Sequence, residues 1–169
     1  MLDARSVGHR TTTTMSSPIG PLTLVATDGV LTGLYMDEQR HPPAAGPHGE
    51  PDPAAFADVE AQLAAYFAGG LTSFDVPLTL TGTPFQQRVW GALRDIPYGE
   101  TLSYGQLAAR IGQPTACRAV GLANGRNPIS ILVPCHRVVG ADGRLTGYGG
   151  GLPRKEQLLA LERHAARPG

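Results

Sequence analysis

The order of apolar and polar residues divides the chain into a first half that predicts a sheet with one helix and a second half that predicts mainly helices. In residues 16–36, SSPIGPLTLVATDGVLTGLYM, short apolar runs are separated by Pro-Ile-Gly-Pro and Asp-Gly, which favours strands joined by tight turns. Residues 52–70 predict a helix that begins at Asp52. The expected buried face of this helix consists of Phe56, Val59, Leu63 and Phe67. Residues 73–80 are expected to form a strand or an extended linker.

Helical periodicity continues from Pro84, where apolar residues recur every four positions. Ser103 and Gln106 have the spacing of a capping box and predict the start of a second helix. A short break at QPT leads into a third helical segment at residues 116–124, and a last helix is expected from Pro153. Two short helices joined by a tight turn are typical of a helix-turn-helix. We therefore expect an α+β chain with an N-terminal domain at residues 1–80 and a mainly helical C-terminal domain at residues 81–169.

The helical segment at 116–124 has unusually small residues on the side expected to face solvent. At about 100° per residue, the expected core face consists of Ala116, Ala119, Val120 and Ala123. The opposite face consists of Arg118, Gly121, Leu122 and Gly125. Long polar side chains normally read bases in the major groove, so this helix suits a widened minor groove, with Arg118 reaching into the base stack. Close packing on a neighbouring helix explains the glycines equally well.

Charge and composition narrow the possible classes of function. The net charge is zero, yet residues 1–83 carry three basic and nine acidic residues, whereas residues 84–169 carry eleven basic and five acidic residues. A basic half fits a polyanionic partner, although a solvated basic surface fits as well. We expect no membrane span and no signal peptide, and the two cysteines then favour a reducing cytoplasm. The five histidines are scattered, and we expect no metal site.

Cys135 lies between a proline and a His-Arg pair in the segment NPISILVPCHRVVG, residues 127–140. Free cysteine is often a small buried hydrophobe, but a thiol beside a base can also be a nucleophile. Neighbouring side chains of an extended segment point to opposite sides, so we expect a water molecule or a turn to link His136 to the thiol. Glu162 and Glu156 are the candidate acids that would orient this base.

Several separated blocks resemble one protein family. IPYGETLSYGQLA, ACRAVGLANGRNP, ILVPCHRVVG and TGYGGGLPRKEQLLALE are similar to the C-terminal domain of the O6-alkylguanine-DNA alkyltransferases, also called methylated-DNA–protein-cysteine methyltransferases. The blocks run in the family's order through nearly all of residues 84–162. The first half resembles the family's N-terminal domain more loosely, through SPIGPLTL and LAAYFAG. The resemblance implies a ribonuclease-H-like sheet domain followed by a winged-helix-like helix-turn-helix domain.

The resemblance also implies roles for individual residues. Cys135 would accept the alkyl group, and His136 would act as a water-mediated base oriented by Glu162. Tyr104 would protonate or hydrogen-bond the guanine as it leaves. Arg118 would fill the gap left by the extruded base.

Four residues would form the substrate pocket. Asn127 would stabilise the turn behind the cysteine, and Val138 would bound the pocket through its backbone. Tyr148 and Gly149 would form the opposite wall. Some relatives have a serine where this chain has Gly149, so only a backbone N–H would meet the O6 atom. The further residues expected at the DNA are Thr115, Ala119, Gly121, Asn124, Arg126 and Arg137.

The implied function is DNA repair by direct reversal. The protein would flip an O6-alkylguanine, or an O4-alkylthymine, out of double-stranded DNA from the minor groove and take its alkyl group irreversibly. No cofactor is expected, and the protein would act as a monomer with cooperative binding along DNA as a further possibility. Two alternatives stay open: a damage-sensing protein without chemistry, and a thiol hydrolase that turns over many times.

Overall fold

A mostly antiparallel sheet forms the N-terminal part of the computed structural model, which describes residues 9–36, 49–146, 148 and 151–166. Strands β1 (Arg10–Met15), β2 (Leu22–Thr27) and β3 (Val30–Met36) pair antiparallel, and the short β4 (Glu50–Pro51) joins β1 in parallel. The strand order is β3-β2-β1-β4. Asp28 and Gly29 both have positive φ between β2 and β3, so the tight turn predicted at Asp-Gly is confirmed.

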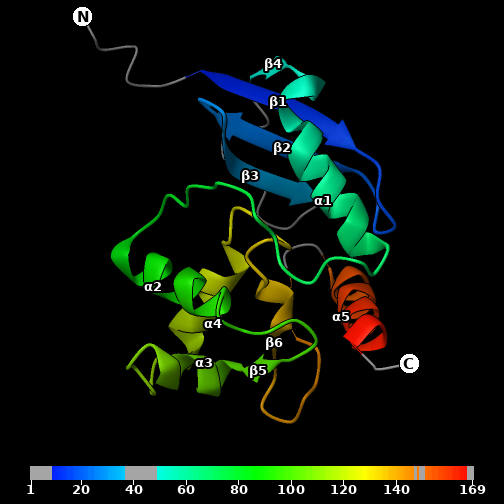
Figure 1. Cartoon of the computed structure of the whole chain (residues 1–169). Helices are drawn as coiled ribbons and strands as arrows, with labels where there is room; N and C mark the ends of the chain where they lie inside the picture. The colour runs from blue at the N-terminus through cyan, green and yellow to red at the C-terminus, as the bar shows by residue number, and fades with distance from the viewer. Residues whose placement is uncertain (1–8, 37–48, 147, 149–150, 167–169) are drawn as a thin grey trace, which may run out of the picture.

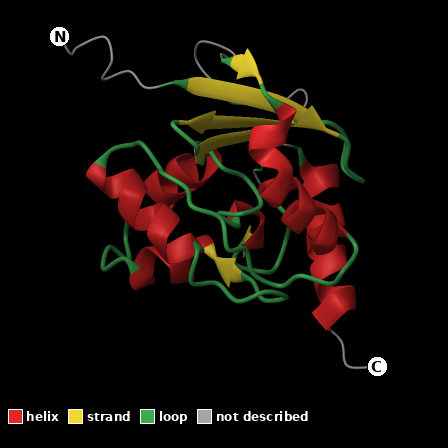
Figure 2. Ribbon diagram, turned by 45° about the horizontal axis from the view of Figure 1, so that its top comes forward, coloured by secondary structure: helices red, strands yellow, loops and turns green. Residues whose placement is uncertain are grey.

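One helix covers a face of this sheet (Figures 1 and 2). A 3₁₀ turn, η2 (Pro53–Phe56), leads into α1 (Ala57–Phe67). The residues of this segment that are buried are Phe56, Val59, Leu63 and Tyr66. Phe67, the fourth residue expected on this face, is partly buried and packs against the core, while Tyr66 beside it is almost fully buried. The interior at this end of α1 contains the carboxylate of Glu162, to which the Tyr66 hydroxyl donates a hydrogen bond.

The C-terminal part is built from helices, as expected. Helices α2 (Pro84–Leu93), α3 (Tyr104–Arg110) and α4 (Cys117–Gly125) pack on one another, and α5 (Leu152–Ala166) lies beside α1 (Figure 1). Capping boxes at Thr83 and Ser103 begin α2 and α3, so both predicted helix starts are confirmed. Helices α3 and α4 form the expected helix-turn-helix. Two short strands, β5 (Leu102–Ser103) and β6 (Val138–Val139), pair in parallel beside α3.

The two parts share one hydrophobic core. The backbone N–H of Leu34 in β3 donates to the carbonyl of Pro128, 2.9 Å away, in the loop that leads to Cys135. Residues 73–80 run between the parts as an extended linker with one bridge, from Leu78 to Leu31. The sheet therefore packs directly against the segment that carries the candidate nucleophile. Within the described residues, no helix is long and apolar enough to cross a membrane.

Candidate active site

The segment before Cys135 is wound into a loop by its own hydrogen bonds. The Asn127 side chain accepts from the N–H of Ile129 at 3.0 Å and donates to the carbonyl of Val133 at 2.7 Å. Ile131 has a φ of 76°, a left-handed conformation that a β-branched residue rarely adopts. Residues 129–139 are all buried. The loop therefore holds Cys135 at a fixed place in the interior.

Cys135 opens a 3₁₀ turn, η3 (Cys135–Arg137), so the chain turns directly after Pro134, which is one of the two arrangements that the sequence left open. Its side chain is buried, and this burial raises the pKa of the thiol. Hydrogen bonding to Asn127, the charge of Lys155 and hydrogen bonding to Ser130 each act in the opposite direction and lower that pKa. The thiol is therefore protonated as it stands, but it lies among groups that stabilise a thiolate.

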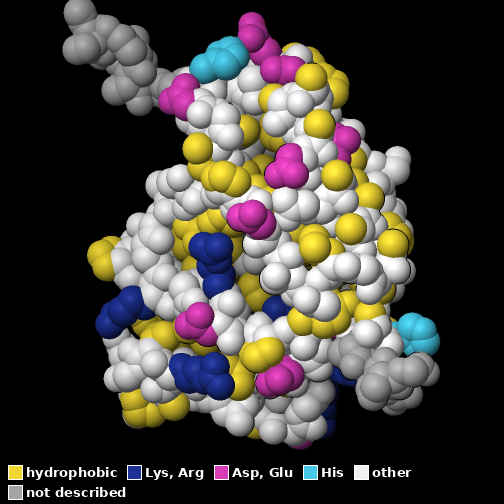
Figure 3. All heavy atoms as spheres, viewed as in Figure 1, with side chains coloured by type: hydrophobic (Ala, Val, Ile, Leu, Met, Phe, Trp, Pro, Cys, Tyr) yellow, Lys and Arg dark blue, Asp and Glu magenta, His cyan; other side chains and the backbone are white. Residues whose placement is uncertain are grey.

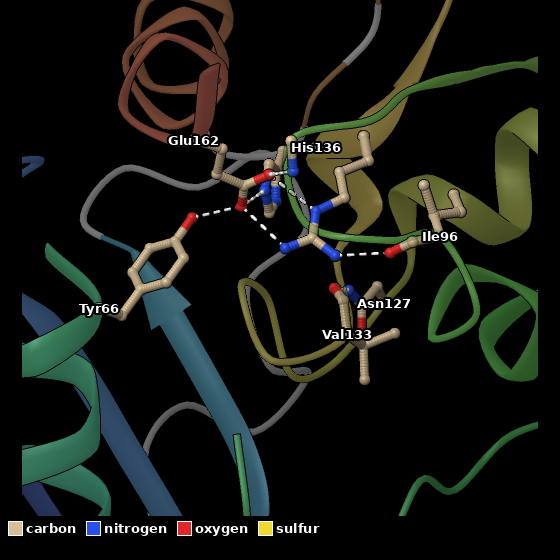
Figure 4. Close-up of polar contacts among 8 residues, drawn as sticks. Tyr66, Ile96, Asn127, Val133, His136 and Glu162 are labelled. Carbon is tan, nitrogen blue, oxygen red and sulfur yellow. Dashed lines mark hydrogen bonds and ion pairs between the residues drawn. The ribbon is translucent and has the colours of Figure 1, made fainter. Parts of the chain in front are cut away.

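His136, Glu162 and Arg137 form a buried polar cluster (Figure 4). The His136 Nε2 lies 2.7 Å from Glu162 Oε2, and Arg137 donates to Oε1 through Nε at 2.8 Å and to Oε2 through Nη2 at 3.0 Å. Burial by itself raises the pKa of Glu162, but the contacts with His136 and Arg137 outweigh it and lower the pKa to about 2. Glu162 is thus ionised, whereas Glu156 is exposed on α5. Of the two candidate acids, only Glu162 orients the histidine.

The imidazole of His136 is neutral and has one nitrogen available. Burial, together with the charges of Arg137 and Lys155, lowers the pKa of His136, although the Glu162 carboxylate acts in the opposite direction. With Nε2–H donated to Glu162, Nδ1 is the nitrogen that accepts a proton. Nδ1 is buried and has no hydrogen-bond partner among the described residues. The cluster therefore holds a base with a free lone pair one residue from the thiol.

Two tyrosines and a lysine lie around the thiol. The Tyr104 hydroxyl donates to the carbonyl of Thr146 at 3.1 Å, and the Lys155 ammonium donates to the same carbonyl at 2.7 Å. Lys155, the chain's single lysine, is fully buried, and desolvation lowers its pKa to about 8. The Tyr148 hydroxyl is buried without a hydrogen-bond partner in the described part of the chain, and burial raises its pKa. These groups supply hydrogen-bond donors and one positive charge near the sulfur.

The helix-turn-helix presents few long side chains to solvent. Thr115, Arg118, Ala119 and Arg126 are exposed along α4 and its flanks, and Leu122 is 68% exposed. A Cβ added at Gly121 would lie 3.8 Å from the Tyr104 ring, so this glycine lies on the side of α4 that faces that ring. On the face drawn in Figure 3, Lys and Arg side chains gather over the lower, C-terminal part of the molecule.

Comparison with known proteins matches both parts of the chain to domains of one protein family. Residues 11–80 match the family described as 6-O-methylguanine DNA methyltransferase, ribonuclease-like domain, and residues 84–164 match its DNA binding domain. The methylated-DNA–protein-cysteine methyltransferase of Mycobacterium tuberculosis strain H37Rv is 63% identical over 153 residues, which are 90% of this chain and 92% of that protein.

The chain belongs to the methylated-DNA–protein-cysteine methyltransferase family. A relative from Methanosarcina acetivorans is 51% identical over 86% of this chain and 94% of its own length. The crystal structure of M. tuberculosis OGT in complex with DNA superposes with a TM-score of 0.89 at 62% identity, over 92% of this chain and 94% of that one. The expected ribonuclease-H-like and helix-turn-helix organisation of the methyltransferase is therefore confirmed.

Three expectations for α4 and the following loop need correction. Asn124 was expected at the DNA, but it is buried and its amide donates to the carbonyl of Cys135 at 3.3 Å. Arg137 was also expected at the DNA, but its guanidinium is held by Glu162 and by the carbonyl of Ile96, 2.7 Å from Nη1. Ala119 is exposed rather than part of the core face. The helix is rotated so that Asn124 faces the cysteine loop, because this amide satisfies a buried carbonyl.

The remaining predicted residues have the following places in the methyltransferase. Val138 is fully buried in β6, where it pairs with Leu102 of β5. Gly149 lies outside the described residues. Sequence reasoning missed Tyr66 and Lys155, which the fold brings to the site from α1 and α5. Lys155 could have been singled out because it is the one lysine in a chain whose other basic residues, apart from histidine, are all arginine. Tyr66 was missed because it lies outside the four-residue apolar spacing by which the buried face of α1 was predicted.

Proposed function

We propose that this methyltransferase repairs DNA by transferring an alkyl group from the O6 atom of guanine to the sulfur of Cys135, once per protein molecule. The observation that carries the proposal is the buried thiol in a fixed loop, directly before a histidine whose Nδ1 is free and whose Nε2 is held by an ionised Glu162. Membership of the family supports it. The roles assigned to the other residues follow from their positions around that thiol.

The first step is activation of the thiol. His136 Nδ1 takes the proton of Cys135 through a bridging water, and Glu162 stabilises the imidazolium that results. Glu162 is suited to this role because its pKa, lowered to about 2, keeps it negative throughout the neutral range. Asn127, Lys155 and Ser130 stabilise the thiolate, since each lowers the pKa of Cys135.

The second step is an in-line displacement at the alkyl carbon. The sulfur–carbon bond forms as the carbon–O6 bond breaks, and the electron pair of that bond passes to the guanine. Tyr104 donates a hydrogen bond or a proton to the guanine ring as it leaves, and Tyr148 bounds the pocket. The product on the protein is a thioether, which the neighbouring groups have no route to cleave. Each molecule therefore reacts once.

The O6 atom lies inside the duplex, so the nucleotide must be flipped out of the stack at a cost of a few kcal/mol. Helix α4 contacts the minor groove, and Arg118 fills the gap that the base leaves. Exposed Thr115, Ala119 and Arg126 flank Arg118 on the same surface. We extend the proposal to O4-alkylthymine, to action as a monomer and to the cytoplasm, where a free thiol such as Cys135 stays reduced.

The test is incubation with duplex DNA that contains O6-methylguanine, followed by intact mass measurement and peptide mapping. We expect one methyl group per chain, located on Cys135, and none on the exposed Cys117 or in the Cys135→Ser variant. The Cys135→Ser variant should keep its DNA affinity, because phosphate contacts supply most of it. Absence of transfer by the wild-type protein would support a damage sensor, and continuous product formation would support a hydrolase.

A further inference from the structure

Tyr66 connects the N-terminal domain to the candidate catalytic cluster. Its hydroxyl donates to Glu162 Oε2 at 2.6 Å, and that same oxygen lies 2.7 Å from His136 Nε2. Both side chains are almost fully buried, with 1% of Tyr66 and 1% of Glu162 exposed. Figure 4 shows the Tyr66 phenol pointing toward the Glu162 carboxylate, with His136 close to the same carboxylate. A short hydrogen bond to an ionised, buried carboxylate is among the stronger neutral–charged contacts in proteins.

We propose that Tyr66 is a positioning residue for alkyl transfer: its hydroxyl bonds the carboxylate oxygen that faces His136 and sets how strongly Glu162 holds the imidazole proton. Arg137 already fixes the carboxylate with two hydrogen bonds, so the hydroxyl is not needed to orient Glu162. Its effect is to withdraw charge from Oε2, in addition to the hydrogen bond that Arg137 Nη2 makes to the same oxygen. The N-terminal domain thereby moderates the basicity of the histidine in the other domain, a role that rests on the proposed function of Cys135.

The aromatic rings around Tyr66 hold its side chain in place, so that its hydroxyl is a fixed hydrogen-bond donor. Its ring lies 5.3 Å from those of Phe67 and Phe74 and 6.1 Å, edge-on, from that of Tyr98. The Glu162 carboxylate is itself almost fully buried, and in such an environment each hydrogen-bond donor counts for more. The other titratable groups that act on His136 and Glu162 in the described part of the chain are Arg137, Lys155, Tyr98, Tyr148 and Tyr66 itself. Cys135 is the group with which His136 would exchange its proton.

The Tyr66→Phe variant tests the proposal because it keeps the ring and removes only the donor. With one donor fewer, Oε2 carries more charge and attracts the His136 proton more strongly, so the pKa of His136 should rise. We expect the acid limb of the pH–rate profile with free O6-benzylguanine to move to higher pH. On that limb the rate should fall by roughly threefold to tenfold, with the plateau changed by less than about twofold.

Tyr35→Phe is the matched control and should leave the profile unchanged, because Tyr35 is half-buried on β3 and the charged group that acts on its hydroxyl is Arg10 rather than Glu162. NMR titration of labelled histidine should show the rise for His136 directly, without reference to activity. An unshifted titration, or uniform slowing at every pH, would overturn the proposal. If Tyr66→Phe does not fold, 3-fluorotyrosine at position 66, a stronger donor, should shift the His136 titration to lower pH, and no shift would again overturn it. Failure of the wild-type protein to react would instead count against the proposed function.

Discussion

Single buried residues decide the electrostatics of the site, because a buried polar group that loses its partner is costly to leave unpaired. Glu162 receives hydrogen bonds from Tyr66, His136 and Arg137, which come from two domains. Lys155 contributes the one positive charge from α5 that acts on the Cys135 sulfur. The effect of Glu162 or Lys155 on the reactivity of Cys135 can therefore be measured by pH–rate profiles, separately from its effect on folding.

Glu162→Gln should slow alkylation of Cys135 by free O6-benzylguanine roughly tenfold or more, because His136 loses the anion that stabilises its protonated form.

The pKa of Glu162, lowered to about 2, also predicts a pH dependence of stability. A carboxylate with a depressed pKa stabilises the fold above its unfolded pKa and loses that contribution as pH falls through the folded pKa. Between about pH 5 and pH 2, the wild-type protein should lose about 3 kcal/mol more than the variant in urea unfolding. If the unfolding free energies of the wild type and the variant fell in parallel between these pH values, the lowered pKa of Glu162 would be contradicted.

Lys155→Met should slow the reaction of Cys135 with O6-benzylguanine at neutral pH by roughly tenfold, because the thiolate loses a buried cation. The pKa of Lys155 is lowered to about 8, so the wild-type lysine itself loses charge as pH rises through that value. The difference between the two proteins should therefore shrink above about pH 8 in a pH–rate series. Arg163→Met, which removes an exposed charge from the same helix, is the control and should have no effect.

At the scale of elements, the helix-turn-helix separates DNA contact from chemistry. Helix α4 presents Arg118, Ala119 and Leu122 to solvent while its opposite side holds the Cys135 carbonyl through Asn124. Capping boxes fix where α2 and α3 begin, which in turn places Tyr104 at the first position of α3. One helix thus serves as the DNA-facing surface and as the support of the cysteine loop.

Arg118→Ala should slow repair of duplex DNA far more than reaction with free O6-benzylguanine, since only the duplex requires base flipping. Second-order rate constants for both substrates measure the two effects in one preparation. Arg88→Ala removes an exposed charge from α2, outside the helix-turn-helix, and should change both rates little. Equal slowing by Arg118→Ala on the two substrates would place this arginine in the chemistry and remove its proposed role in the DNA.

At the scale of the whole molecule, the two parts of the chain share one packed hydrophobic core. Leu34 of β3 is fully buried, bridges to Ile129 and donates through its backbone to Pro128. Apolar residues of the sheet, α2, α4 and α5 belong to the same core. The N-terminal sheet therefore supports the loop that carries Cys135.

Leu34→Ala should destabilise the protein by about 2–5 kcal/mol, because it opens a cavity where the sheet meets the cysteine loop. Trp90, the single tryptophan, reports on the C-terminal part, and far-UV circular dichroism reports on both parts. We expect the two probes to give coincident urea transitions in the wild type and in the variant. Separate transitions would show that the parts unfold independently.

The sequence by itself determined the elements whose causes are local. The Asp28-Gly29 turn, the capping boxes at Thr83 and Ser103 and the helix-turn-helix follow from residues within a few positions of one another. Such features depend on short-range hydrogen bonds and side-chain periodicity, which the order of residues states directly. The residues around Cys135 left a structural cysteine and a nucleophile both open, and the resemblance to the alkyltransferases decided for the nucleophile.

Only the tertiary structure decided which distant groups meet. Tyr66 and Glu162 are 96 positions apart, and the choice of Glu162 over Glu156 depends on which face of α5 is buried. Polar residues such as Asn124, Arg137 and Lys155 are normally expected at the surface, but here all three are buried. A buried polar group must find its partners wherever the packed chain supplies them, so its role is set by three-dimensional packing rather than by its neighbours in sequence.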